Sequence, residues 1–185
     1  GDGYRNDLGF APRRGVGIST WELERNLRPK KFEGLVRQFT VGTEGSLYSE
    51  TDFDRWLSRE VRFDFSAEFQ DGGRFGVDYD RLFEVLEDPF EIHEGIPILT
   101  GTYRFNQIVA NYTTNSSKWL SGSIRHTRGG FWDGNISGWR GSLRARASEH
   151  LAAEISYERN SVELPSGAFG TDLAAVRVDY SFTTD

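Results

Sequence analysis

The charged residues with the most regular spacing lie between residues 59 and 86, where they alternate with apolar side chains. Apolar residues occupy every second position from Val61 to Phe69, with acidic, basic or neutral polar residues between them, and the alternation resumes after the Gly-Gly of residues 72–73. Opposite charges on paired strands form ion pairs across a sheet. The pattern therefore predicts one charged face whose role is electrostatic and involves no bond-making.

The sequence gives little support for catalysis. Its three histidines, His93, His126 and His150, have no paired spacing typical of a metal site. No nucleophile-elbow, zinc-protease or phosphate-loop motif occurs, and the Gly-rich "DGGRFG" at 71–76 is better explained as a hairpin turn. We therefore expect no enzyme activity, no cofactor and no resident metal.

Three aromatic residues, Trp56, Phe131 and Trp132, are candidates for a binding role. Each falls in a segment that we expect to form a longer loop, where an exposed ring could stack on a sugar. Anchoring at a membrane interface explains them equally well. Carbohydrate is therefore one expected partner and outer-membrane lipid another.

Composition limits the alternatives. The 185 residues carry a net charge of -6 without a basic, aromatic-interleaved patch, which disfavours nucleic acid as a partner. Mean hydropathy is -0.55, and no apolar run approaches the roughly 20 residues of a membrane helix. The absence of cysteine fits an oxidising compartment. A β-barrel remains open, because alternating strands conceal their membrane character from hydropathy averages.

Alternation with period two recurs along the whole chain and predicts an all-β fold. We expect one antiparallel up-and-down meander domain over residues 1–185, forming a β-barrel or part of one. Its nine or so predicted strands are 15–27, 32–50, 59–70, 74–86, 99–113, 118–128, 135–147, 151–162 and 173–182.

The predicted connections alternate in length. Short links at 29–31, 71–73, 115–117 and 148–150 would lie at one end of the sheet, and longer ones at 51–58, 86–98, 129–134 and 159–171 at the other. This asymmetry is typical of outer-membrane barrels. A soluble up-and-down barrel with long loops around a ligand site shows it too, so both alternatives stay open.

The strands are long and rich in aromatics near their ends. Several exceed the usual five or six residues of globular strands, and a tilted membrane strand needs about 9–11. The aromatics near strand ends are Trp21, Trp56, Phe83, Trp119, Phe131, Trp132, Tyr157 and Phe182. Arg81 is the contrary observation, because it interrupts the apolar alternation and an arginine facing lipid is costly away from an interface.

If the sheet is a barrel in a membrane, Val61, Phe63, Phe65 and Phe69 face lipid and the charges face the lumen. The predicted lumen-lining residues are Arg62, Asp64, Glu68, Arg74, Asp78, Asp80, Arg140, Arg144, Arg146, Glu154, Arg177 and Asp179.

Three segments carry a resemblance to a known family. "EDPFEIHEGIPILTGTYRF" (87–105), "RGGFWDG" (128–134) and "SYERNSVELPSGAFGTDLAAVRVDYSFTTD" (156–185) resemble the C-terminal region of a bacterial family of unknown function. "RNDLGFAPRRGV" (5–16) is similar to an earlier part of that region. Members join an N-terminal carbohydrate-binding-like domain to a C-terminal outer-membrane β-barrel.

The resemblance implies a location in the bacterial outer membrane, and the alternative is a soluble periplasmic or extracellular protein. It brings no catalytic residues. The carbohydrate-binding-like domain has no counterpart here, and the odd strand number differs from the even number of bacterial barrels. We expect part of a larger barrel, acting as a pore or as a membrane anchor for a surface carbohydrate-handling protein. Remaining strands or another chain would complete it.

Overall fold

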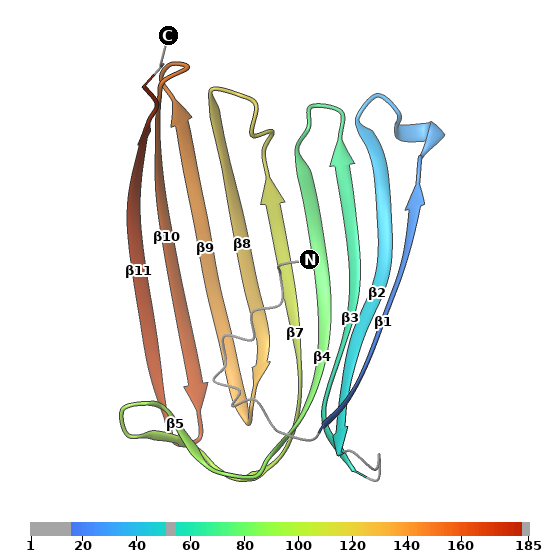
Figure 1. Ribbon diagram of the computed structural model, residues 1–185, viewed down its shortest axis with the longest axis vertical. Coiled ribbons are helices and arrows are strands. Elements are labelled where there is room, and N and C mark those ends of the chain that lie inside the picture. The colour runs from blue at the N-terminus through green and yellow to red at the C-terminus, as the bar shows by residue number, and fades with distance from the viewer. Residues whose placement is uncertain (1–15, 51–54, 183–185) are drawn as a thin grey trace.

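The chain forms an antiparallel meander sheet (Figure 1). A computed structural model describes residues 16–50 and 55–182. The sheet order is β1-β2-β3-β4-β7-β8-β9-β10-β11. Neighbouring strands in the sheet are therefore also consecutive in the chain, except that β5 and β6 come between β4 and β7 in the sequence. The strands are β1 (Val16–Leu27), β2 (Val36–Glu50), β3 (Trp56–Phe69), β4 (Arg74–Leu86), β7 (Gly101–Thr113), β8 (Leu120–Phe131), β9 (Gly134–Arg146), β10 (Leu151–Leu164) and β11 (Gly167–Tyr180).

The predicted all-β meander of nine strands is confirmed, and the described sheet is not closed into a barrel. β1 and β11 are its two edges (Figure 1). Residues 32–35, predicted as the start of a strand, lie outside β2, because the 3-10 turn Lys30–Phe32 and a following turn occupy that segment.

A second sheet lies inside the predicted long loop 86–98. Two short strands, β5 (Phe90–His93) and β6 (Ile96–Ile98), pair antiparallel around Gly95, whose φ of 73° is in the left-handed region that glycine tolerates. Sequence reading missed this hairpin, because strands of three and four residues carry too little alternation to be recognised.

The predicted asymmetry of loop lengths is wrong. Two of the four expected long connections are two-residue turns, at 132–133 and 165–166, because β8, β10 and β11 extend further than predicted. We name the end of the sheet with these turns and with β5–β6 the hairpin end. The opposite end carries the turns 70–73, 114–119 and 147–150 (Figure 1).

The hairpin β5–β6 packs across one face of the sheet at the hairpin end. Its ring contact between His93 and Phe169 spans 4.8 Å, and Ser166 Oγ donates a hydrogen bond to the Pro97 carbonyl at 3.2 Å. The segment that joins β4 to β7 thus reaches β10 and β11. The buried cluster beneath it consists of Ile96, Ile98, Phe131, Trp132, Val162 and Leu164.

Candidate functional site: the two faces of the sheet

All twelve predicted lumen-lining residues lie on one face, which we call the polar face. The ladder registers place them there, because cross-strand partners share a face and alternate residues change face. They come from β3, β4, β9, β10 and β11, and the residues are Arg62, Asp64, Glu68, Arg74, Asp78, Asp80, Arg140, Arg144, Arg146, Glu154, Arg177 and Asp179. The hairpin β5–β6 covers the hairpin end of this same face.

Arg62 is the centre of the largest ion-pair group on the polar face. Its Nε donates to Asp80 Oδ1 at 2.6 Å, Nη1 to Glu44 Oε1 at 2.8 Å and Nη2 to Glu60 Oε1 at 3.4 Å. Asp80 is only 5% exposed. One guanidinium therefore joins β2, β3 and β4 and neutralises a buried carboxylate, which is the condition for keeping such a charge away from water.

A second group joins β9, β10 and β11. Arg144 contacts Glu154 at 3.4 Å and Asp179 at 3.0 Å, and Asp179 also accepts from Arg177 at 2.7 Å. Two rows of the polar face away, Arg140 Nε donates to Glu158 at 2.7 Å. All of these contacts except Arg177–Asp179, which lies within β11, are electrostatic links between strands, and their geometry shows no nucleophile or general base.

The opposite face, which we call the apolar face, is the more exposed of the two. In β10, Leu151, Ile155 and Tyr157 are exposed, with Ile155 at 55%, whereas the Glu158 side chain of the polar face is only 25% exposed. In the edge strand β11 both faces are exposed, with Val176 at 74% on the apolar face and Leu173 at 66% on the polar face. A folded domain in water usually shows the reverse distribution.

The apolar surface extends over most of the sheet, because most cross-strand partners on this face are apolar, with Arg25, Thr43 and His126 as exceptions. One ladder row runs from Ala67 through Phe75, Tyr112 and Ile124 to Tyr157. The exposed members of the apolar face are Leu23, Leu27, Val41, Phe63, Phe65, Tyr79, Ile108, Tyr112, Leu120, Ile124, Trp139, Leu143, Leu151, Ile155, Tyr157, Val176, Val178 and Tyr180.

The apolar face ends in polar residues along a slanted line at the hairpin end. Arg59 marks this boundary on β3. Counted from the row of Arg59 and away from the hairpin end, the boundary lies one row further at Arg81 on β4, two rows further at Arg128 on β8 and three rows further at Arg159 on β10. On β11 the boundary stays in the row of Arg159, at Asp172, so it advances three rows of two residues over the six strands that follow β3. One residue per strand corresponds to a strand tilt of about 35° for standard strand spacings.

The position of Arg81 removes the objection that it raised in the sequence. It lies at the boundary of the apolar face beside Arg59 and Arg104, and all three are exposed. Arg59, Arg81, Arg104, Arg128 and Arg159 follow this boundary from strand to strand, and we call them the arginine rim. Sequence reading missed the rim because its members are isolated arginines, yet each occupies an apolar-phase position near a strand end.

Two of the three predicted loop aromatics are not exposed. Phe131 and Trp132 are buried under the hairpin β5–β6, where Trp132 packs edge-on against Tyr103 and Phe90. The prediction that these two rings are presented to a sugar is therefore wrong. Their burial results from a hairpin that the sequence pattern did not reveal. Trp56 is half-exposed at the start of β3.

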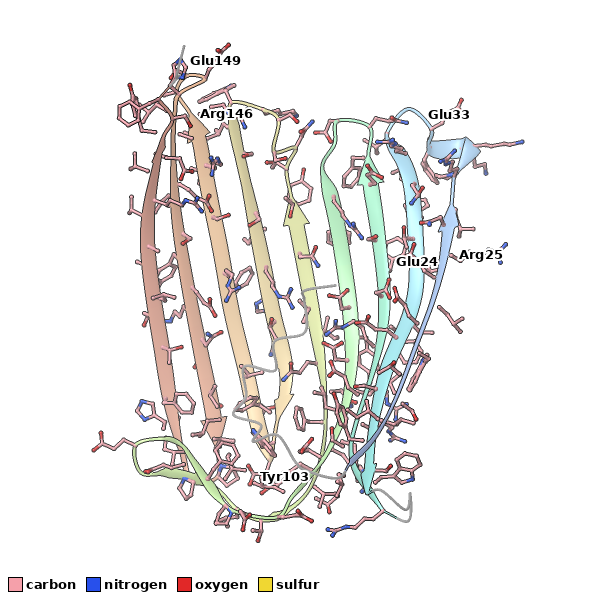
Figure 2. All side chains as sticks on the ribbon, in the orientation of Figure 1. Glu24, Arg25, Glu33, Tyr103, Arg146 and Glu149 are labelled. Atoms are coloured by element: carbon pink, nitrogen blue, oxygen red, sulfur yellow. The ribbon has the colours of Figure 1, made fainter. Side chains whose placement is uncertain are left out.

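Each end of the sheet has its own polar contacts. Figure 2 shows Tyr103 at the hairpin end and Arg146 and Glu149 at the opposite end. In the β3–β4 turn at that opposite end, the Asp71 carboxylate accepts a hydrogen bond from the Gly73 N–H. Lys118 of the next turn forms an ion pair with the same carboxylate at 3.3 Å. Both contacts hold the pKa of the Asp71 carboxyl below its usual range.

The described residues contain no group of three or more His, Asp or Glu side chains placed to bind a metal ion. None of them forms a helix with the length and apolar character that a bilayer crossing requires. Comparison of the chain with protein-family models, with curated proteins and with solved structures gives no match. The fold and the site together define an all-β antiparallel meander sheet with a charged, partly enclosed face and an exposed apolar face.

Proposed function

We propose that this chain is a segment of a bacterial outer-membrane β-barrel, acting as a pore or as the membrane anchor of a surface carbohydrate-handling protein. The observation that carries the proposal is the inverted exposure of the two faces. Ile108 and Ile155, in inner strands, are more than half exposed, while Asp80 and Arg62 lie on the more enclosed face. Lipid is the solvent that stabilises such an apolar surface.

The dimensions of the apolar face support a bilayer. Its slanted boundary gives strands tilted by about 35°, within the roughly 35–45° range of transmembrane barrels. On β3 the apolar positions run from Val61 to Phe69. At about 3.3 Å per residue and this tilt they span about 22 Å along the membrane normal, close to the roughly 25 Å band of such barrels.

The proposal requires further strands to complete the barrel. β1 and β11 run in the same direction, because eight antiparallel steps separate them. An all-antiparallel ring therefore needs an odd number of additional strands between these two edges. Unpaired backbone groups at an edge are too costly in lipid for the described sheet to be the whole wall. The remaining strands, or another chain, are the partners that this geometry requires.

The carbohydrate association rests on the sequence resemblance and on Trp56, since Phe131 and Trp132 are buried. A soluble barrel or sandwich that binds a glycan through its loops is the alternative function. In that protein the exposed apolar face would have to be covered by another part of the protein. A probe placed on this face can tell whether it contacts protein, lipid or water.

The test uses single cysteines, which are clean probes because the chain has none. Ile155→Cys and Ser156→Cys are adjacent positions of β10 on opposite faces. Each variant is prepared together with the strands that complete the barrel, labelled with a polarity-sensitive fluorophore and reconstituted into phosphatidylcholine vesicles. We expect nitroxide-labelled lipid to quench the probe at residue 155 and aqueous iodide to quench the probe at residue 156.

A second pair, Val178→Cys and Asp179→Cys, repeats the comparison on β11. The membrane proposal fails if the chain remains monodisperse in detergent-free buffer and the probes at residues 155 and 178 are shielded from iodide. Iodide quenching at all four positions in the presence of vesicles contradicts it as well.

A further inference from the structure

We propose that the arginine rim at β3, β4 and β7 binds the phosphate of anionic membrane lipids. This inference rests on the proposed membrane location and adds a specific lipid partner. Arg59 and Arg104 occupy the two positions that flank Phe83 in one ladder row, and Arg81 lies one row further toward the apolar face. Three exposed guanidinium groups therefore surround one aromatic ring.

The aromatic ring holds two of these arginines in place. The guanidinium of Arg104 lies 5.1 Å from the centre of the Phe83 ring, and that of Arg59 lies 5.9 Å from it. Cation–π contacts of this kind fix the flat guanidinium groups without using their N–H donors. None of the three arginines forms an ion pair with a carboxylate in the part of the chain that the structure describes.

A hollow of about 520 Å³ adjoins the arginines on the apolar side. Its lining consists of the two arginines Arg59 and Arg104 and of the apolar residues Trp21, Leu47, Trp56, Val61 and Phe83. The hollow combines an apolar wall with two guanidinium groups. A free phosphate ion uses only the guanidinium groups, whereas a lipid uses both, with its phosphate on the arginines and an acyl chain along the apolar wall.

The charges further along the rim place the site at β3–β7. Arg159 has Asp172 as its cross-strand partner, and Glu163 lies two ladder rows further toward the hairpin end. These carboxylates reduce the positive potential on β10 and β11. Around Phe83 the nearest rows of the apolar face carry arginines, apolar residues and Asn106. Among the described residues of the arginine rim, the excess of positive charge is therefore greatest beside the hollow.

The experiment measures phosphatidylglycerol bound to the full chain in micelles of a neutral detergent by native mass spectrometry. The test variant is Arg59→Gln/Arg104→Gln. The control Arg125→Gln/Arg146→Gln removes the same charge from the polar face. Each basic residue near a membrane surface strengthens binding about fivefold, so we expect the test variant to bind phosphatidylglycerol about 25-fold more weakly, and the control to bind like the parent chain.

Excess inorganic phosphate should leave the lipid bound, because the apolar hollow contributes to its affinity. Equal losses in both double variants, unchanged binding in the test variant, or full displacement by inorganic phosphate would overturn the inference. Insertion into phosphatidylcholine vesicles, followed by the cysteine probes described above, is scored separately. Insertion without selective phosphatidylglycerol binding refutes only the lipid site, and failure of the completed barrel to insert refutes the membrane proposal itself.

Discussion

An arginine placed in the middle of the apolar face distinguishes lipid from water as the solvent of that face. Ile155 lies near the centre of the apolar positions on β10, between its ladder partners Leu143 and Val176. An arginine facing lipid at the bilayer midplane costs about 2–4 kcal/mol of barrel stability. We therefore expect Ile155→Arg to lower the free energy of unfolding by this amount, a change of about 30-fold to 1,000-fold in the unfolding equilibrium.

A water-exposed face predicts a much smaller effect. Ile155 is 55% exposed, so less than half of its surface packs against neighbouring residues. Only these contacts are lost when the side chain is replaced. Full burial of an isoleucine contributes about 1.5–3 kcal/mol, which limits the loss in water to about 1 kcal/mol. The long arginine stem can cover part of the same neighbours, which reduces it further.

The assay is equilibrium unfolding in guanidinium chloride, followed by the fluorescence of the five tryptophans of the chain in vesicles. The matched control is Ser156→Arg, where the next residue of the same strand points to the polar face beside Ser142 and Ala175. We expect this control to stay within about 1 kcal/mol of the parent chain. Equal effects of the two arginines would refute the assignment of the apolar face to lipid.

Three further substitutions test the packing. Arg62→Met leaves the buried carboxylate of Asp80 uncompensated and should destabilise the chain by about 2–4 kcal/mol in denaturant unfolding, whereas Arg140→Met, whose side chain is 64% exposed, should cost less than about 1 kcal/mol. Ile98→Ala, at a side chain that is 1% exposed, should cost about 2–4 kcal/mol and increase amide exchange in β5–β6 ahead of the main sheet. Gly134→Ala should destabilise by more than about 1 kcal/mol, because a Cβ there would collide with the Glu163 carbonyl oxygen, whereas Gly34→Ala, with open space around it, should be nearly neutral; thermal unfolding of both variants measures the difference.

The main strands and their faces could be predicted from the sequence because each is specified locally. Alternation over ten or more residues fixes both the strand and the face, and the ladder then adds neighbours in phase, as for Phe63 opposite Tyr79. Strand ends were less predictable. The Pro-Ser-Gly of residues 165–167 indicates a turn, yet Val162 and Leu164 stay in β10 because they pack in the cluster under β5–β6.

The hairpin end shows the limit of local reasoning most clearly. Nothing near Phe131 or Trp132 in the sequence indicates burial, since both flank a turn rich in glycine and aspartate. They are buried because Ile96 and Ile98, more than thirty residues earlier, fold back over them. Such a contact between distant segments is decided by tertiary packing and has no periodic signal.

The arginine rim connects the sequence pattern to the membrane proposal. A single interruption such as Arg81 argues against lipid when its strand is considered alone. Once the registers align Arg59, Arg81 and Arg104 around Phe83, the interruption becomes a point on a slanted boundary. Soluble barrels also have tilted, staggered strands, but their outer face is largely polar, whereas tilted strands that cross a flat bilayer carry an outer apolar band whose boundary shifts by about one residue at each strand. The tilt of that boundary therefore argues more strongly for lipid than the alternation within any one strand.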